Sequence, residues 1–194
     1  MLDLFDAPVL PGLASRPELV TPAEQRDLIA AIDATDLTPF RFQGWTGKRL
    51  TTSFGFHYDF ETQRLARAAP MPDWLLSVRA RMATFAGLDP DLLIQALLIR
   101  YDPGAGIGWH RDRPIYDHVL GLSLGASATM RFRRPRHGGG FDRASLALEP
   151  RAAYHLSGEA RHDWAHSIVA VDETRWSITF RSASARGRAV LTAT

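Results

Sequence analysis

The sequence contains no cysteine in its 194 residues. Disulfides and thiolate metal ligands are therefore excluded, and a structural zinc would need histidine and carboxylate ligands alone. No apolar run approaches the roughly 20 residues that a membrane-spanning helix needs. The first residues, MLDLFDAPVLPGL, carry acids where a signal peptide carries basic residues. We therefore expect a cytoplasmic protein with no membrane partner.

Lysine is almost absent too, because Lys48 is the only one and nearly all of the 23 basic residues are arginine. The net charge is only +2, yet the pI is about 9.4. Arginine suits bidentate contacts to phosphate or carboxylate groups. This composition permits a nucleic-acid partner without requiring one, because a genome rich in arginine codons would give the same ratio.

The chain predicts a single domain with helices near its N-terminus and many short strands after them. Residues 1–20 form an irregular lead-in with Val9 and Leu10 among its apolar anchors. The capping-box sequence Thr21–Glu24 predicts a helix over 22–33, and an apolar stripe predicts another over 72–86. Residues 38–60 read as short strands or a hairpin. Further strands are expected at 94–101, 107–112, 117–124, 128–134, 145–148, 152–157, 165–170 and 175–181. Such a pattern indicates a β-sandwich or jelly roll.

His110 and Asp112 lie two residues apart in the segment LLIRYDPGAGIGWHRD (97–112). Residues two apart in a strand point to the same side. An imidazole nitrogen and a carboxylate oxygen can thus face one point, while Arg111 faces away. They make two-thirds of the 2-His-1-carboxylate triad that holds non-haem Fe(II). An H-x-D pair also arises by chance, so this hypothesis depends on a third ligand.

The candidates for a third ligand are His118, His137, His155, His162 and His166. His137 lies in an Arg/Gly-rich loop at 131–140, and His118 begins an expected strand where it can simply pair. His162 and His166 have the spacing of a helical zinc pair. Gly158 before them and a β-like SIVAV segment after them argue against a continuous helix. We therefore favour His166, at the start of a strand.

The segment 175–181, RWSITFR, places Arg175, Ser177, Thr179 and Arg181 on one face by alternation. Two arginines facing inward are costly unless both have anionic partners. The segment spans about 20 Å, so the arginines would reach separate anionic groups. In the alternative interpretation, both arginines face solvent and Trp176, Ile178 and Phe180 face the core.

Together these motifs resemble the AlkB family of Fe(II)/2-oxoglutarate-dependent dioxygenases. The H-x-D pair, a histidine 54 positions after the Asp, and R-x5-R on the last strand occur in family order. They are accompanied by RYDPGA (100–105), Ser123-Leu124-Gly125 and Gly158-Glu159-x-Arg161. The resemblance covers residues 90–182.

The resemblance implies a mainly β fold with flanking helices (α+β). Its core would be a double-stranded β-helix, which is a jelly-roll or cupin-like barrel, with an N-terminal helical and substrate-lid extension. We expect one domain over 1–194: helices and a nucleotide-recognition lid over 1–90, the catalytic barrel over 91–182, and a tail over 183–194. We also expect a monomer.

By position, the resemblance implies His110, Asp112 and His166 as the ligands of Fe(II). Tyr101 and Arg175 would contact the distal carboxylate of 2-oxoglutarate, and Arg181 its C1 carboxylate. With O2, such an enzyme oxidatively demethylates alkylated bases of the N1-methyladenine or N3-methylcytosine type in DNA or RNA. The products are formaldehyde, succinate and CO2, and DNA repair is the role expected.

Two departures concern the substrate and cosubstrate contacts. Nucleic-acid demethylases of the family have Asn two residues before the Tyr, where this chain has Ile99. After Asp112 come Arg113 and Pro114, in place of acidic residues that some members use to read the base.

A methylated base would be flipped out or taken from a single strand, stacked on aromatic rings and flanked by cations. The candidate substrate contacts are Trp45, Arg49, Phe54, Phe56, Tyr58, Arg111, Arg113, Arg133 and Arg134, with Trp109 and Arg136 nearby. Lid packing and a solvated loop would explain the same residues.

Three other interpretations stay open. The same chemistry could act on a protein or a small molecule. From another class, the chain could be a non-catalytic nucleic-acid-binding module with a relict pocket. A zinc-loaded cupin-like barrel is the last, and it gives no reason for Arg175 and Arg181.

Overall fold

The computed structural model describes residues 9–42, 45–59 and 64–192. Four α-helices and one 3-10 helix occur in this part of the chain: α1 (Pro22–Asp33), α2 (Asp73–Ala86), η1 (Pro90–Leu92), α3 (Gly158–His162) and α4 (Ala185–Thr192). The strands are β1 (Leu13–Arg16), β2 (Thr38–Phe42), β3 (Trp45–Phe54), β4 (Phe56–Asp59), β5 (Arg64–Arg67), β6 (Leu93–Tyr101), β7 (Ile107–His110), β8 (Tyr116–Gly125), β9 (Ala128–Pro135), β10 (Phe141–Leu148), β11 (Ala153–Leu156), β12 (Ala165–Ile168) and β13 (Arg175–Ala183).

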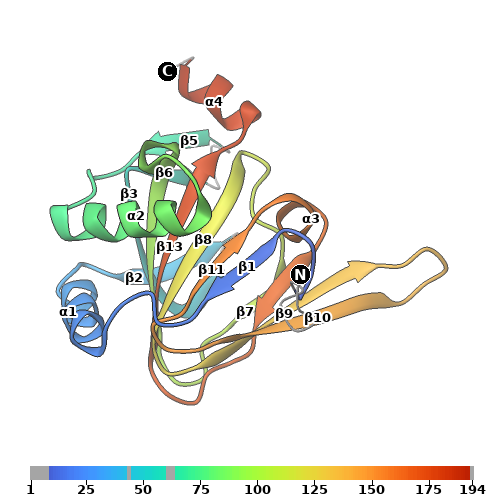
Figure 1. Cartoon of the computed structure of the whole chain (residues 1–194), viewed down its shortest axis with the longest axis horizontal. Coiled ribbons are helices and arrows are strands. Elements are labelled where there is room, and N and C mark those ends of the chain that lie inside the picture. The colour runs from blue at the N-terminus through green and yellow to red at the C-terminus, as the bar shows by residue number, and fades with distance from the viewer. Residues whose placement is uncertain (1–8, 43–44, 60–63, 193–194) are drawn as a thin grey trace, which may run out of the picture.

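Two antiparallel sheets face each other and enclose the interior of the protein (Figure 1). The large sheet has seven strands in the order β1-β11-β8-β13-β6-β3-β2, and the small sheet has four in the order β10-β9-β12-β7. A separate two-stranded sheet pairs β4 with β5. This arrangement of two facing antiparallel sheets agrees with the predicted jelly roll.

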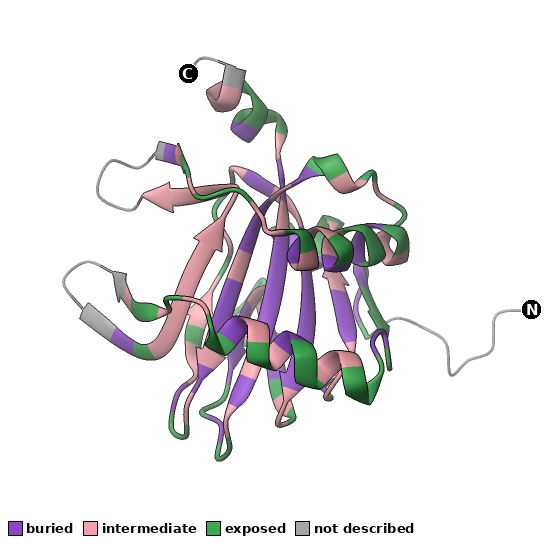
Figure 2. Ribbon diagram, turned by 90° about the vertical axis from the view of Figure 1, so that its left-hand side faces the viewer, coloured by how far each residue is buried: buried purple, intermediate pink, exposed green. Residues whose placement is uncertain are grey.

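Helices α1 and α2 pack against the outer face of the large sheet (Figure 1). Leu28 and Ile32 of α1 and Leu75 and Met82 of α2 join the buried cluster formed by the even-numbered residues of β6, β8 and β13. The Thr21 side chain accepts from the Glu24 amide while Glu24 accepts from the Thr21 amide, which is the predicted capping box. Buried residues line the central strands in Figure 2. The outer face of the large sheet is therefore a hydrophobic core.

The opposite faces of the same strands point between the two sheets. A second buried cluster lies there and includes Ile99, Tyr101, Phe132, Tyr154 and Ile168. Buried polar residues share this interior, among them Ser177 and Thr179 on β13 and Ser123 on β8. A polar, partly charged interior between two sheets can hold a small anionic ligand.

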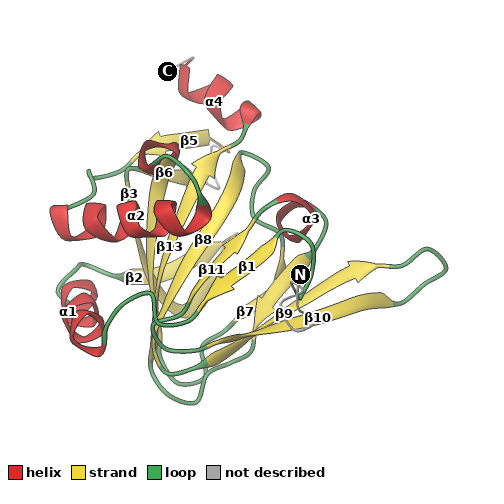
Figure 3. Ribbon diagram, viewed as in Figure 1, coloured by secondary structure: helices red, strands yellow, loops and turns green. Residues whose placement is uncertain are grey.

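Several sequence-based expectations differ from the structure. The lead-in is not irregular throughout, because β1 pairs with β11 at the edge of the large sheet, and Val9 is exposed, whereas Leu10 is buried. Residues 131–135 belong to β9, and only 136–140 form the tip of the hairpin, which projects in Figure 3. Strand β10 begins at Phe141, four residues before the strand expected at 145, and the expected tail contains α4. No helix among the described residues is both long and apolar enough to cross a membrane.

Candidate metal centre

His110, Asp112 and His166 converge on one point between the sheets, where each offers a ligand atom within 4.8 Å of the others. His110 ends β7 and lies directly opposite His166 of the neighbouring strand β12. Their ring centroids are 4.3 Å apart. Asp112 lies two residues beyond the end of β7, and its Oδ2 is 3.7 Å from His166 Nε2. The hypothesis of one nitrogen-and-oxygen cluster from these three residues thus agrees with the geometry.

The protonation of His110 leaves a nitrogen available to a metal. His110 Nδ1 is 2.9 Å from the carbonyl oxygen of Gly108. Because a carbonyl oxygen only accepts, Nδ1 carries the proton and Nε2 keeps its lone pair. Burial also lowers the pKa of His110. For His166, burial and the neighbouring His110 lower the pKa to about 3, so both rings are neutral at pH 7.

Asp112 remains ionised although it is buried. Burial alone would raise its pKa, but Arg181 and the two histidines lower the pKa well below the ordinary value. Its Oδ2 is buried and has no hydrogen-bond partner among the described residues. A buried carboxylate oxygen of this kind, aimed at two neutral imidazoles, fits a divalent cation.

Arg175 is a candidate group for binding an anion in the same interior. Its side chain is fully buried, and its Nε donates to Ser123 Oγ at 3.2 Å. Nη1 and Nη2 have no partner among the described residues. Tyr101 lies opposite Arg175 across the β6–β13 pair, with its ring 5.0 Å from the guanidinium carbon. An unpaired buried guanidinium beside a phenol fits one carboxylate group.

Arg181 lies at the metal end of β13, where its Nε donates to Asp112 Oδ1 at 3.0 Å. Its Nη1 donates to Gln95 Oε1 at 3.3 Å. Both arginines of the R-x5-R motif therefore face inward, and the alternative with both facing solvent is wrong. Ser177 and Thr179, which lie between the two arginines on the same face, are small and buried.

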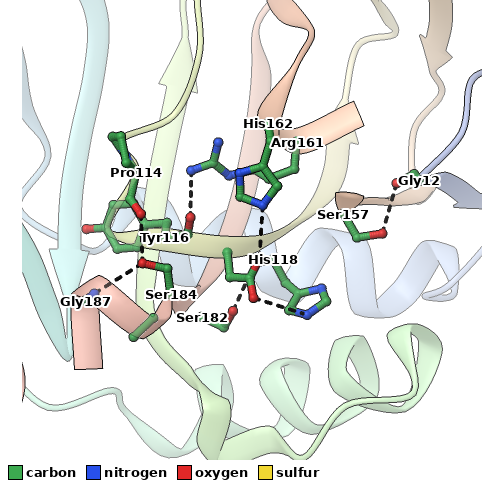
Figure 4. A network of polar contacts seen from close by, with 12 residues as sticks. Gly12, Pro114, Tyr116, His118, Ser157, Arg161, His162, Ser182, Ser184 and Gly187 are labelled. Atoms are coloured by element: carbon green, nitrogen blue, oxygen red, sulfur yellow. Dashed lines mark hydrogen bonds and ion pairs between the residues drawn. The ribbon is translucent and has the colours of Figure 1, made fainter. Parts of the chain in front are cut away.

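The G-E-x-R motif supports the chain segment that follows Asp112. Arg161 in α3 is buried, and its Nη2 donates to the carbonyl oxygens of Arg113 and Tyr116 at 2.6 and 2.8 Å. Ser184 donates to the carbonyl oxygen of Pro114 from the other side (Figure 4). Arg161 was identified only as part of a motif, and this supporting contact was not predicted.

The predicted substrate contacts occupy different surroundings. Arg49 is partly buried, and its guanidinium carbon is 4.0 Å from the Phe40 ring centroid. Its charge acts on Tyr101 and Asp112. Arg113 follows Asp112 directly in the chain, and its guanidinium carbon lies 5.0 Å from the ring centroid of Tyr58 on β4. Arg49, Tyr58 and Arg113 thus lie near the metal centre.

Other predicted contacts lie elsewhere. Phe54 packs in the hydrophobic core on the outer side of the large sheet, and Phe56 faces Arg67. Arg111 is exposed and donates to the carbonyl oxygen of His162. The side chain of Trp45 lies outside the described part of the structure.

Arginine and aromatic side chains cover the outer face of the small sheet. Arg131 and Arg133 lie 5.2 and 4.3 Å from the ring of Trp109, and Arg133 also lies 4.8 Å from Phe141. Arg143 lies directly opposite Arg133. We call these five residues the outer arginine face. Arg134 and Arg136 point to the other side, where they form ion pairs with Asp142.

The remaining candidate histidines lie outside the metal centre. His118 and His155 contact each other through ring nitrogens 2.9 Å apart, and His162 is 3.2 Å from Asp117. His137 lies at the exposed tip of the β9–β10 hairpin. Helix α3 ends at His162, so His162 and His166 do not share a helix.

Comparison with known proteins is consistent with this geometry. A family model described as the 2OG-Fe(II) oxygenase superfamily matches residues 12–193. Two relatives are each 29% identical over 82% of this chain. They are the tRNA (carboxymethyluridine(34)-5-O)-methyltransferase alkbh8 of Xenopus tropicalis and the alkylated DNA repair protein ALKBH8 homolog of Arabidopsis thaliana. The chain spans 25% and 51% of their respective lengths.

A solved structure shares the fold. The structure of OsALKBH1 has a TM-score of 0.67, covers 89% of this chain and 97% of its own, and is 14% identical. Fe(II) and 2-oxoglutarate are the cofactor and cosubstrate of the superfamily that the profile describes. The chain therefore belongs to the 2OG-Fe(II) oxygenase superfamily, and within it to the AlkB family of 2-oxoglutarate-dependent dioxygenases.

Proposed function

We propose that this dioxygenase oxidatively demethylates alkylated bases in DNA or RNA. The observation that carries the proposal is the convergence of His110, Asp112 and His166 beside a buried arginine whose Nη atoms have no partner among the described residues. In this proposal the three residues bind Fe(II) and leave three positions on the metal for other ligands. Arg175 and Tyr101 bind the distal carboxylate of 2-oxoglutarate, and Arg181 lies by its C1 carboxylate.

When bound, Fe(II) with O2 and 2-oxoglutarate oxidises an N-methyl carbon, which leaves as formaldehyde while the keto acid becomes succinate and CO2. The protein contributes position and charge. Arg181 keeps Asp112 ionised and fixes its Oδ1 through the hydrogen bond at 3.0 Å. Gly108 fixes the ring of His110, and the apolar residues around Tyr101 exclude water from the keto acid.

The outer arginine face supports a nucleic-acid substrate. Among the described residues, its outward positions on β7, β9, β10 and β12 carry no Asp or Glu, so the charges of Arg131, Arg133 and Arg143 are not neutralised within the face. Guanidinium groups beside aromatic rings suit phosphates and bases of a single strand. The printed names of two relatives, which refer to tRNA and to alkylated DNA, also support this class.

The first experiment tests the chemistry and the substrate together. The protein, purified anaerobically and supplied with Fe(II), ascorbate and 2-oxoglutarate, should convert oligonucleotides carrying N1-methyladenine or N3-methylcytosine and release formaldehyde and succinate. His110→Ala should abolish both products. Succinate without base repair would reject the nucleic-acid substrate and favour a protein or small molecule. Full activity in His110→Ala would refute the ligand assignment.

A second experiment tests the path of the strand. The double variant Arg131→Ser/Arg133→Ser should bind a labelled single-stranded oligonucleotide more weakly, and the dependence of affinity on salt should become shallower. Turnover of a methylated nucleoside, which has no flanking phosphates, should be unchanged. Arg26→Ser removes an exposed arginine from α1 and is the matched control. Equal losses in the control and the double variant would contradict a specific role for this face.

A further inference from the structure

Tyr154 is a buried phenol in the interior between the sheets. It is not among the residues assigned above to the cosubstrate. It belongs to β11, next to β8 in the large sheet, and only 6% of its surface is exposed. Its ring is part of the cluster between the sheets, together with Tyr101, Ile99 and Phe132. Tyr154 therefore points into the interior between the sheets and not toward the helices on the outer face.

Gly121 makes room for this ring. The two residues lie directly opposite each other on β8 and β11. A Cβ atom on Gly121 would lie 2.2 Å from Tyr154 Cζ and 2.4 Å from its hydroxyl oxygen. Any other residue at 121 would force the ring to move, because these separations are far below van der Waals contact. The ring thus crosses β8 toward Thr179 of β13, the residue on the far side of Gly121.

The side chain of Arg175 is directed toward the same part of β8. Its Nε donates to Ser123, which is two residues along β8 from Gly121 and on the same face. The guanidinium therefore lies between Tyr101 on one side and the β8–β11 pair on the other. The positive charges of Arg175 and Arg181 both act on the Tyr154 hydroxyl, and Arg175 acts more strongly.

The hydroxyl of Tyr154 is a neutral donor. Burial raises its pKa to about 12, even though Arg175 opposes this shift. A phenol that stays protonated can donate one hydrogen bond to a carboxylate. Ile99, which faces the same interior from β6, has no such donor.

We propose that Tyr154 binds the distal carboxylate of the keto-acid cosubstrate, as a third donor beside Arg175 and Tyr101, and that Gly121 is required to admit its ring. This goes beyond the proposed nucleic-acid substrate, because it concerns only how the chain holds 2-oxoglutarate. The ordinary alternative is that Tyr154 only fills the core, in which case phenylalanine would serve equally well.

The test compares two keto acids that differ only at the distal end. 2-Oxopentanoate has the same five-carbon chain as 2-oxoglutarate but ends in a methyl group. Anaerobic calorimetry with Mn(II) in place of Fe(II) measures the binding of each without turnover or nucleic acid, so the result does not depend on the proposed substrate. We expect Tyr154→Phe to weaken 2-oxoglutarate binding about ten-fold and to leave 2-oxopentanoate binding unchanged.

Two further variants separate the hydroxyl from packing. Gly121→Ser should displace the ring and reproduce the selective loss of 2-oxoglutarate affinity. Leu156→Val alters a buried apolar residue on the same strand and face, so it should not change the ratio of the two affinities. Equal affinities of wild type and Tyr154→Phe for 2-oxoglutarate would overturn the proposal. So would a loss of the same size for both keto acids.

Discussion

Arg181 contacts only one oxygen of Asp112. Its Nε and Nη2 lie 3.0 and 2.9 Å from Oδ1, whereas Oδ2 faces His166 at 3.7 Å without a hydrogen bond. Arg181 thus holds one carboxylate oxygen in place and leaves the other available to a ligand. The fixed oxygen sets the direction of the other, which is the arrangement that a metal ligand with a supporting partner requires.

This division predicts that Asp112 matters for stability as well as for metal binding. Asp112→Asn leaves the Arg181 charge buried without its counter-charge, so the free energy of unfolding should fall by about 3 kcal/mol. Mn(II) binding should be lost. Urea denaturation and calorimetry measure the two effects. Asp142→Asn is the control, because it breaks only solvent-exposed pairs, with Arg134 and Arg136, and should change neither quantity appreciably. Equal destabilisation by the two changes would contradict this account.

Two buried arginines should respond to substitution in opposite ways. In Arg175→Met an unpaired guanidinium is replaced by apolar atoms, so the apoprotein should keep or gain thermal stability while 2-oxoglutarate affinity falls at least 100-fold. In Arg161→Met the carbonyl oxygens of Arg113 and Tyr116 lose their donor, so the melting temperature should drop. Calorimetric melting and anaerobic binding distinguish the two. Destabilisation of the apoprotein by Arg175→Met would indicate a structural role.

Two glycines before His110 differ in how well they would tolerate a side chain: Gly106 precedes β7, and Gly108 lies within it. A Cβ on Gly106 would lie 2.8 and 2.9 Å from backbone atoms of Ile168 and Ala170, whereas Gly108 has open space around it. Gly106→Ala should destabilise the protein by about 2 kcal/mol and weaken Mn(II) binding, because β7 and β12 must move apart. Gly108→Ala should be close to neutral. Denaturation curves of both variants test this, and matching curves would contradict it.

The stability of the apoprotein should depend on pH through His155. Burial and the neighbouring His118 lower the pKa of His155 to about 4, compared with about 6.5 in an unfolded chain. Between these values the unfolded chain binds the extra proton. The free energy of unfolding therefore falls as the pH falls from about 6.5 to about 4, and this contribution is fully present above that interval.

His155→Gln removes the titrating ring. Urea denaturation at several pH values should show a slope reduced by up to about one proton between pH 4.5 and 6 relative to wild type. His118 and Asp117, whose side chains lie 3.9 Å apart, are retained in both proteins. An unchanged slope would mean that His155 does not titrate in this range.

The metal centre was predictable from the sequence because its chemistry depends on residue type and spacing. Alternation alone placed Arg175 and Arg181 on one face, although deciding that this face points inward needed the family resemblance. The helices at 22–33 and 72–86 were also predictable, since a capping box and an apolar stripe are local signals.

Contacts between distant strands were not predictable in this way. β1 is only four residues long and is held by pairing with β11, so no local pattern announces it. Tyr154 and Gly121 are 33 positions apart, and neither is unusual until the register places them opposite each other. Phe54 was assigned to substrate by its neighbours in the sequence, whereas strand alternation turns it to the core.

The two faces of strand β7 carry side chains of two different sites. His110 faces the metal, and the adjacent Trp109 faces the arginines outside. Inserting or deleting one residue within β7 (Ile107–His110) would exchange these faces, because side chains alternate along a strand. The length of β7 itself is therefore constrained. The hairpin tip at 136–140 carries no such constraint, so its length and sequence can vary without disturbing the residues of the metal centre.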